Sequence, residues 1–176
     1  AFKKEQSSLK FLDRGTVDSY LVLRHDGLIT SASFSPNSHM VLTTSNDKTA
    51  RIWDAHSGKL SLVLTGHQGA VTHGCFSPDG QQVFTASQDR TARIYDVKTG
   101  NPSGSLAGHT DAVSYVGVSP DGKTAVTASA DRTARLWSVS NGRMLQLLGG
   151  HTAEVTSASF SIDGKTVLTA SRDQTI

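Results

Sequence analysis

The chain lacks several features on which whole classes of protein depend. It contains one cysteine, Cys75, so no disulfide can form within it, and a reducing compartment, cytoplasmic or nuclear, is expected. Cys75 alternates with apolar neighbours, which is typical of a buried and inert thiol. No apolar run approaches the roughly 18 residues that a membrane-spanning helix requires, so no such helix is expected.

Charge of one sign is also scarce. Lys and Arg total 17 against 15 Asp and Glu, a formal net charge of +2 with no basic block, which does not favour nucleic-acid binding. The sequence has no Gly-rich phosphate loop and no Cys/His pair at a chelating spacing, so neither a cofactor nor a metal is expected. Aromatic residues are only 6%, and the abundant Gly, Ser and Thr suit many short strands joined by tight turns.

What the chain does contain is a repeat of 42 residues. The same step separates successive members of three series, which are His25, His67, His109 and His151, then Asp47, Asp89, Asp131 and Asp173, then Trp53, Tyr95 and Trp137. A chain of 176 residues holds about four such units, each too small to bury a core alone. Periods of about 40–45 residues indicate propellers or solenoids.

One unit, residues 66–107, shows the expected local structure. Residues 70–76, 82–87 and 92–96 alternate as strands, and Ser77-Pro78-Asp79-Gly80 is a turn signal. A fourth strand over 101–106 contains Pro102, which favours an edge position. Neighbouring apolar residues such as Val83 and Phe84 predict a sheet buried on both faces. We therefore expect an all-β propeller of four-stranded antiparallel blades.

These residues resemble the WD-repeat β-propeller family, through the recurring Gly-His, Ser-Pro-Asp-Gly, Ser-x-Asp and Trp-Asp signals. The units are 25–66, 67–108, 109–150 and a truncated 151–176, a partial ring of about four blades. Arg24 replaces the Gly before the first histidine, and Tyr95 replaces Trp. Residues 1–24 are interpreted as an arm and the outer strand of a preceding blade.

The preceding blade follows from counting back 42 residues. Leu62 then corresponds to Tyr20 and Trp53 to Phe11, so Tyr20-Leu21-Val22-Leu23 is expected to be a fourth strand, with a degenerate third strand around Leu9–Leu12. The remaining blades of the ring would come from the same polypeptide or from a second copy, two copies giving about eight blades.

Each unit also contains Ser, His and Asp, which taken alone would suggest a hydrolase. A catalytic constellation is needed once, whereas this set recurs in phase, so no catalytic residue is expected. The resemblance implies a structural hydrogen-bond network instead. Its members are His25, Ser45, Asp47 and Trp53; His67, Ser87, Asp89 and Tyr95; His109, Ser129, Asp131 and Trp137; and His151, Ser171 and Asp173. The repeated Arg51, Arg93 and Arg135 are each expected to reach a nearby carboxylate.

The resemblance further implies that partners bind the face that carries the histidine loops and the Asp turns. The exposed positions expected there are Asp26, Leu28, Asn46, Gln68, Ala70, Gln88, Asp111, Ala112, Ala130, Glu154 and Arg172. They differ between units, which fits a binding surface and also fits neutral drift. Two functions stay open: a non-catalytic scaffold for protein or peptide partners, or a sensor propeller attached to a signalling NTPase or protein kinase.

Overall fold

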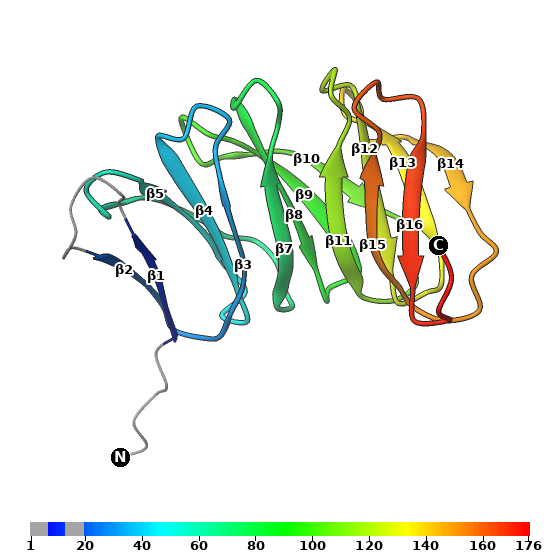
Figure 1. Cartoon of the computed structure of the whole chain (residues 1–176), viewed down its shortest axis with the longest axis horizontal. Helices are drawn as coiled ribbons and strands as arrows, with labels where there is room; N and C mark the ends of the chain where they lie inside the picture. The colour runs from blue at the N-terminus through cyan, green and yellow to red at the C-terminus, as the bar shows by residue number, and fades with distance from the viewer. Residues whose placement is uncertain (1–6, 13–19) are drawn as a thin grey trace, which may run out of the picture.

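The computed structural model describes residues 7–12 and 20–176, which form strands and turns (Figure 1). The predicted all-β class is confirmed, because these residues contain no helix. None of them therefore belongs to a helix that could cross a membrane.

Three complete blades follow one another along the chain, and each is a four-stranded antiparallel sheet with its strands in sequence order. Blade 1 contains β3 (Ile29–Phe34), β4 (Met40–Ser45), β5 (Ala50–Asp54) and β6 (Leu60–Leu64). Blade 2 contains β7 (Val71–Phe76), β8 (Gln82–Ser87), β9 (Thr91–Asp96) and β10 (Pro102–Ala107). Blade 3 contains β11 (Val113–Val118), β12 (Thr124–Ser129), β13 (Ala134–Ser138) and β14 (Met144–Leu148). Pro102 lies on the outer strand, the position that tolerates its missing N–H.

A two-stranded sheet stands at each end of this row, so that the ring is open (Figure 1). Blade 4 is represented by its first two strands, β15 (Val155–Phe160) and β16 (Val167–Ser171). At the other end β1 (Ser7–Leu12) pairs with β2 (Tyr20–His25). The preceding blade thus contributes a strand pair, where the sequence alone predicted an outer strand beside a degenerate one.

Neighbouring blades pack face to face through apolar side chains. Phe84 of blade 2 is fully buried in one cluster with Val113 and Val116 of blade 3. Leu42 of blade 1 is fully buried in a second cluster with Phe76 and Val83 of blade 2. Because each sheet is covered on both sides, its apolar residues on both faces are explained, as the two-sided pattern predicted.

Hydrogen bonds also join the innermost strands of successive blades. The hydroxyl of Thr30 donates to the carbonyl of Val71 over 2.5 Å. One repeat later the hydroxyl of Thr72 donates to Val113 over 2.6 Å, and after another repeat that of Ser114 donates to Val155 over 2.7 Å. The repeat therefore sets the contacts between blades as well as the fold within each blade.

The first half-blade is out of phase with the 42-residue count by one residue. Leu23 is fully buried with Val41 and Trp53, which is how Leu64 packs with the next blade, and these leucines are 41 positions apart. The reason is the linker, because two residues separate Leu64 from His67 but only Arg24 separates Leu23 from His25.

A glycine explains why the other linkers are longer. Gly66 has φ +119°, in the left-handed region that favours glycine, and so turns the chain before His67. With Arg24 instead, β2 continues without a break into His25. The pairing of Phe11 with Leu21 accordingly places Phe11 at the register position of Ile52, which pairs with Leu62. The prediction that Phe11 replaces the aromatic of the third strand was therefore wrong, and Leu12 takes that position.

Candidate functional site

A chain of buried hydrogen bonds crosses each blade, and blade 3 shows it completely. Trp137 Nε1 donates to the Thr127 hydroxyl over 2.8 Å, and that hydroxyl lies 2.7 Å from His109 Nε2. His109 Nδ1 lies 2.7 Å from Asp131 Oδ2. Since an indole can only donate, the Thr127 oxygen accepts from Trp137 and gives its own proton to His109 Nε2. The imidazole is then left with Nδ1–H, which donates to the carboxylate.

Blades 1 and 4 repeat this arrangement. In blade 1, Trp53 Nε1 donates to Thr43 over 2.8 Å, and His25 lies 2.7 Å from Thr43 and 2.9 Å from Asp47. In blade 4, His151 lies 2.9 Å both from Thr169 and from Asp173.

The hydroxyl in this network is a threonine, so the prediction that Ser45, Ser87, Ser129 and Ser171 fill this place was wrong. The hydroxyls are those of Thr43, Thr85, Thr127 and Thr169. Ser129 is the last residue of β12, beyond the aromatic ring, and its Oγ instead accepts from the Asp131 N–H over 3.1 Å. These serines shape the turn before the aspartate. Both residue types recur every 42 positions, and only the pairing of strands two and three separates them.

The aspartate closes the network at the turn. Asp131 Oδ1 accepts from the backbone N–H and the hydroxyl of Thr133, over 3.0 and 2.6 Å. Its Oδ2 accepts from the Thr110 N–H as well as from His109. Burial would raise the pKa of Asp131, but these hydrogen bonds outweigh it and lower the pKa to about 2. Asp89 has the same surroundings and a pKa lowered to about 2.

The histidines are neutral at pH 7. Burial lowers the pKa of His25, His67 and His109 below 6.5, although the aspartate partner acts in the opposite direction. The hydroxyl within reach of the His109 ring belongs to Thr127, which is fully buried. A substrate has no access to it, so this set of Ser, His and Asp does not assemble as a nucleophile and base.

The aromatic position differs in blades 2 and 4. The Tyr95 hydroxyl donates to the Thr65 carbonyl over 3.0 Å, outside the network. In blade 4 a pocket of about 270 Å³ lies beside His151 and Thr169, whose counterparts in blade 3 contact Trp137.

The repeated arginines reach carboxylates in two of three cases. Arg51 lies 3.5 Å from both Asp47 and Asp26, and Arg135 lies 3.5 Å from Asp131. Arg93 forms no such ion pair among the described residues, so the prediction is wrong for that copy.

The structure joins most of the predicted partner-binding residues in pairs, one pair at the same corner of each blade. A backbone N–H of the Asp turn donates over 2.9 Å to the carbonyl of the residue that precedes the first strand by one position. The pairs are Asn46 with Leu28, Gln88 with Ala70, Ala130 with Ala112, and Arg172 with Glu154. We call the surface formed by these four pairs the paired-loop face. Asp26, Gln68 and Asp111 are exposed beside it.

Exposure varies among the paired residues. Leu28 is 62% exposed, and Asn46, Gln88 and Arg172 are exposed, whereas Ala70, Ala112, Ala130 and Glu154 are half-buried. Sequence reasoning treated Glu154 and Arg172 as independent charges, but Arg172 Nε donates to Glu154 Oε2 over 3.0 Å.

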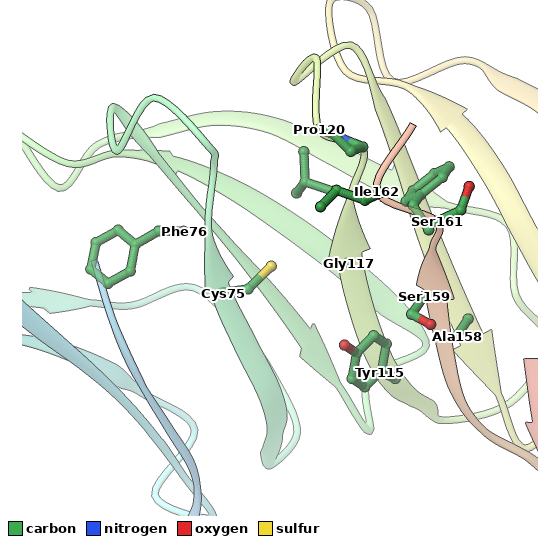
Figure 2. A pocket seen from close by; sticks show the side chains of 11 residues that line it. Cys75, Phe76, Tyr115, Gly117, Pro120, Ala158, Ser159, Ser161 and Ile162 are labelled. Atoms are coloured by element: carbon green, nitrogen blue, oxygen red, sulfur yellow. The ribbon is translucent and has the colours of Figure 1, made fainter. Parts of the chain in front are cut away.

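A second hollow, of about 310 Å³, lies on the inner strands toward the Ser-Pro turns (Figure 2). Cys75, Tyr115 and Gly117 contribute to its lining, together with Ser159 and Ile162. Burial raises the pKa of the Cys75 thiol to about 12, which makes it a poor nucleophile, as predicted. No group of three potential metal ligands occurs among the described residues.

Comparison with known families agrees with this architecture. The model of the WD domain, G-beta repeat, matches residues 18–54, 58–96, 100–138 and 142–176, each match ending on the third strand of a blade or at the turn before it. The comparison with curated proteins gives no match. Because the four matches together span most of the chain, this protein belongs to the WD40 family, the WD domain, G-beta repeat family.

Proposed function

We propose that this chain is a non-catalytic scaffold that binds a protein or peptide partner on its paired-loop face. The observation that carries the proposal is the contrast between a fixed framework and a variable surface. The histidine–aspartate hydrogen bond recurs in all four blades, over 2.7–2.9 Å. The paired residues that this framework holds at the surface differ from blade to blade.

The chemistry of the paired-loop face changes in order along the row of blades. Blade 1 presents the exposed apolar side chain of Leu28. Blades 2 and 3 present the small side chains of Ala70, Ala112 and Ala130, which leave room for a partner to approach the backbone. Blade 4 presents the ion pair of Glu154 and Arg172.

This order supports an extended peptide segment as the partner, running across the blades. An apolar side chain of the peptide would lie on Leu28, and a polar or charged group would meet Glu154 and Arg172. The rigid blades hold these groups at fixed separations, which lowers the entropy lost on binding.

Substitution at the centre of the face tests the proposal. Ala112→Arg fills the floor of blade 3 and should weaken binding of a captured partner at least about tenfold, a loss of about 1.4 kcal/mol. Lys123→Glu is the matched control, because Lys123 is exposed in the hairpin turn at the opposite end of the same blade. Partners would be captured by affinity purification, identified by mass spectrometry and titrated against both variants.

Melting temperatures show whether each variant remains folded. If every captured partner binds the Ala112→Arg variant as tightly as the parent chain, while Lys123→Glu releases it, the partner surface is at the other end of the blades.

A further inference from the structure

The last described blade exposes an apolar residue that the other blades bury. Leu168 on β16 is 55% exposed. Its counterparts one, two and three repeats earlier are Val126, Phe84 and Leu42, and all three are fully buried. They are buried because the next blade covers them, and the described residues place no blade next to β16 on that side.

The first complete blade shows the reverse situation. Ala32 on β3 is exposed, whereas Gly74, Val116 and Ala158 at the same position are buried. Phe34 is 55% exposed, whereas its counterpart Phe76 is 9% exposed. In blades 2 to 4 this surface packs on the first two strands of the blade before. The half-blade before blade 1 contributes the other two strands.

The repeat defines what fits each surface. Phe84 packs on Val113, Val116 and Ala125 of the next blade. Two repeats shift this contact to Leu168 on one side and to Ile29, Ala32 and Val41 on the other. The surface that would cover Leu168 is therefore present on the chain itself, at the opposite end.

The two half-blades are complementary as well. β15 and β16 are strands one and two of a blade, and β1 and β2 hold the register of strands three and four. Placing β1 beside β16 gives the order β15-β16-β1-β2, which is one complete antiparallel blade. The pairing of Val126 with Leu136 and of Thr127 with Arg135 fixes the expected register. It sets Leu168 opposite Phe11, and Thr169 opposite Lys10.

Two local features bear on this junction. Leu12 would take the position of Trp137, where the pocket of about 270 Å³ lies open beside His151. Ile176 stands at the register position of Leu9, and its side chain is 81% exposed. The added strand therefore pairs from Lys10 onward, and Ile176 moves aside.

We propose that a second copy of this chain occupies both end surfaces, so that two copies join head to tail in a closed ring. Each copy supplies three complete blades and two halves, and the shared halves bring the ring to eight blades, within the range of about 4–8 that propellers adopt. The interface is heterologous, and it closes because each copy uses both ends. This inference is independent of the partner that the paired-loop face binds.

Light scattering of the 176-residue chain tests the ring. The expected result is a discrete dimer. Leu168→Arg should raise the dissociation constant of the dimer at least about tenfold. Leu147→Arg is the matched control, since Leu147 is 48% exposed and its counterpart Val63 is 42% exposed even beside a complete blade. A monomer, an open series of larger oligomers, or equal effects of both variants would overturn the proposal.

Cysteine cross-linking tests the register without relying on a variant that weakens folding. In a Cys75→Ser background, copies carrying Phe11→Cys would be mixed with copies carrying Leu168→Cys and oxidised. A heterologous junction gives disulfide-linked dimers in the mixture and none within either population alone. Links between like copies would contradict it. So would a mixture without links whose end surfaces become covered only when a longer polypeptide supplies further strands.

Discussion

The Thr127 hydroxyl lies 2.8 Å from Trp137 Nε1 and 2.7 Å from His109 Nε2, so one fully buried oxygen joins two strands of blade 3 to the loop before its first strand. Each group in this relay depends on the next, because a buried polar group without a partner costs free energy.

Removing that oxygen should destabilise the fold. Thr127→Val keeps the shape of the side chain but leaves Trp137 Nε1 and His109 Nε2 without their partner. We expect a loss of about 1–3 kcal/mol per unsatisfied group. Thr127→Ser keeps the hydroxyl and should cost clearly less. Urea denaturation of the two variants measures the difference, and equal midpoints would show that the hydroxyl is not the stabilising group.

The aromatic residues of blades 2 and 3 should respond differently to loss of their polar atom. Trp137→Phe leaves the buried Thr127 without its donor and opens a cavity, so we expect a loss of about 1–3 kcal/mol from the hydrogen bond together with a packing cost. Tyr95→Phe removes a hydrogen bond to the Thr65 carbonyl, which belongs to an exposed residue that water can reach. That substitution should cost only about 0.5–1.5 kcal/mol. Thermal melts of both variants provide the comparison, and a larger loss for Tyr95→Phe would contradict it.

Mild acid should weaken the fold through the buried histidines. Burial lowers the pKa of His25, His67 and His109 below 6.5 in the folded chain, so between pH 6.5 and those lower values the unfolded chain binds more protons. The free energy of unfolding must then fall as the pH drops below about 6.5. Urea midpoints at pH 7.5 and pH 5 (about 1.5 units below the unperturbed value) should differ. The variant His109→Asn should show a smaller difference, and a midpoint independent of pH would exclude this linkage.

A second loss is expected in stronger acid. The pKa of Asp89 and of Asp131 is lowered from 3.8 to about 2 on folding, so their contribution is present above about pH 4 and is lost between about pH 4 and pH 2. Acid titration followed by circular dichroism should show unfolding in that window. Asp131→Asn removes one of the two carboxyls and should reduce the steepness, provided that comparison is made on the fraction still folded at pH 5.

The hydroxyl links between blades should stabilise the row of sheets. Thr72→Val removes the 2.6 Å hydrogen bond to Val113 of the next blade, and we expect a loss of about 1 kcal/mol. Thr156 holds the corresponding position in blade 4, but its hydroxyl donates to Ala170 within its own blade over 3.2 Å. Thr156→Val should therefore cost less in a monomeric chain. Denaturant midpoints of the two variants, measured side by side, decide between a link across blades and a local effect.

Much of this fold could be predicted from spacing alone. The repeat located the strands of blades 1 to 3, and turn residues such as Asp79 and Gly80 marked the hairpins. Sequence also brought the right histidines and aspartates together, because each recurs every 42 residues at the same place in the unit.

The remaining details depend on register and on conformation, which a period does not reveal. Thr127 and Ser129 recur with equal regularity, and only the pairing of β12 with β13 brings Thr127 beside Trp137. The shift before His25 arises because Arg24 stands where other units have a two-residue link ending in glycine. The ion pair of Glu154 with Arg172 required the backbone contact that joins their loops.

The hydroxyl links on the innermost strands bear on how such a chain can grow in evolution. Each unit carries both the donor for the unit after it, as Thr72 does, and the acceptor for the unit before it, as Val71 does. A tandem duplication of 42 residues therefore delivers a new unit together with a matching interface on either side. Gain or loss of whole units preserves every internal contact, whereas insertion of a part of a unit would leave a donor facing the wrong acceptor.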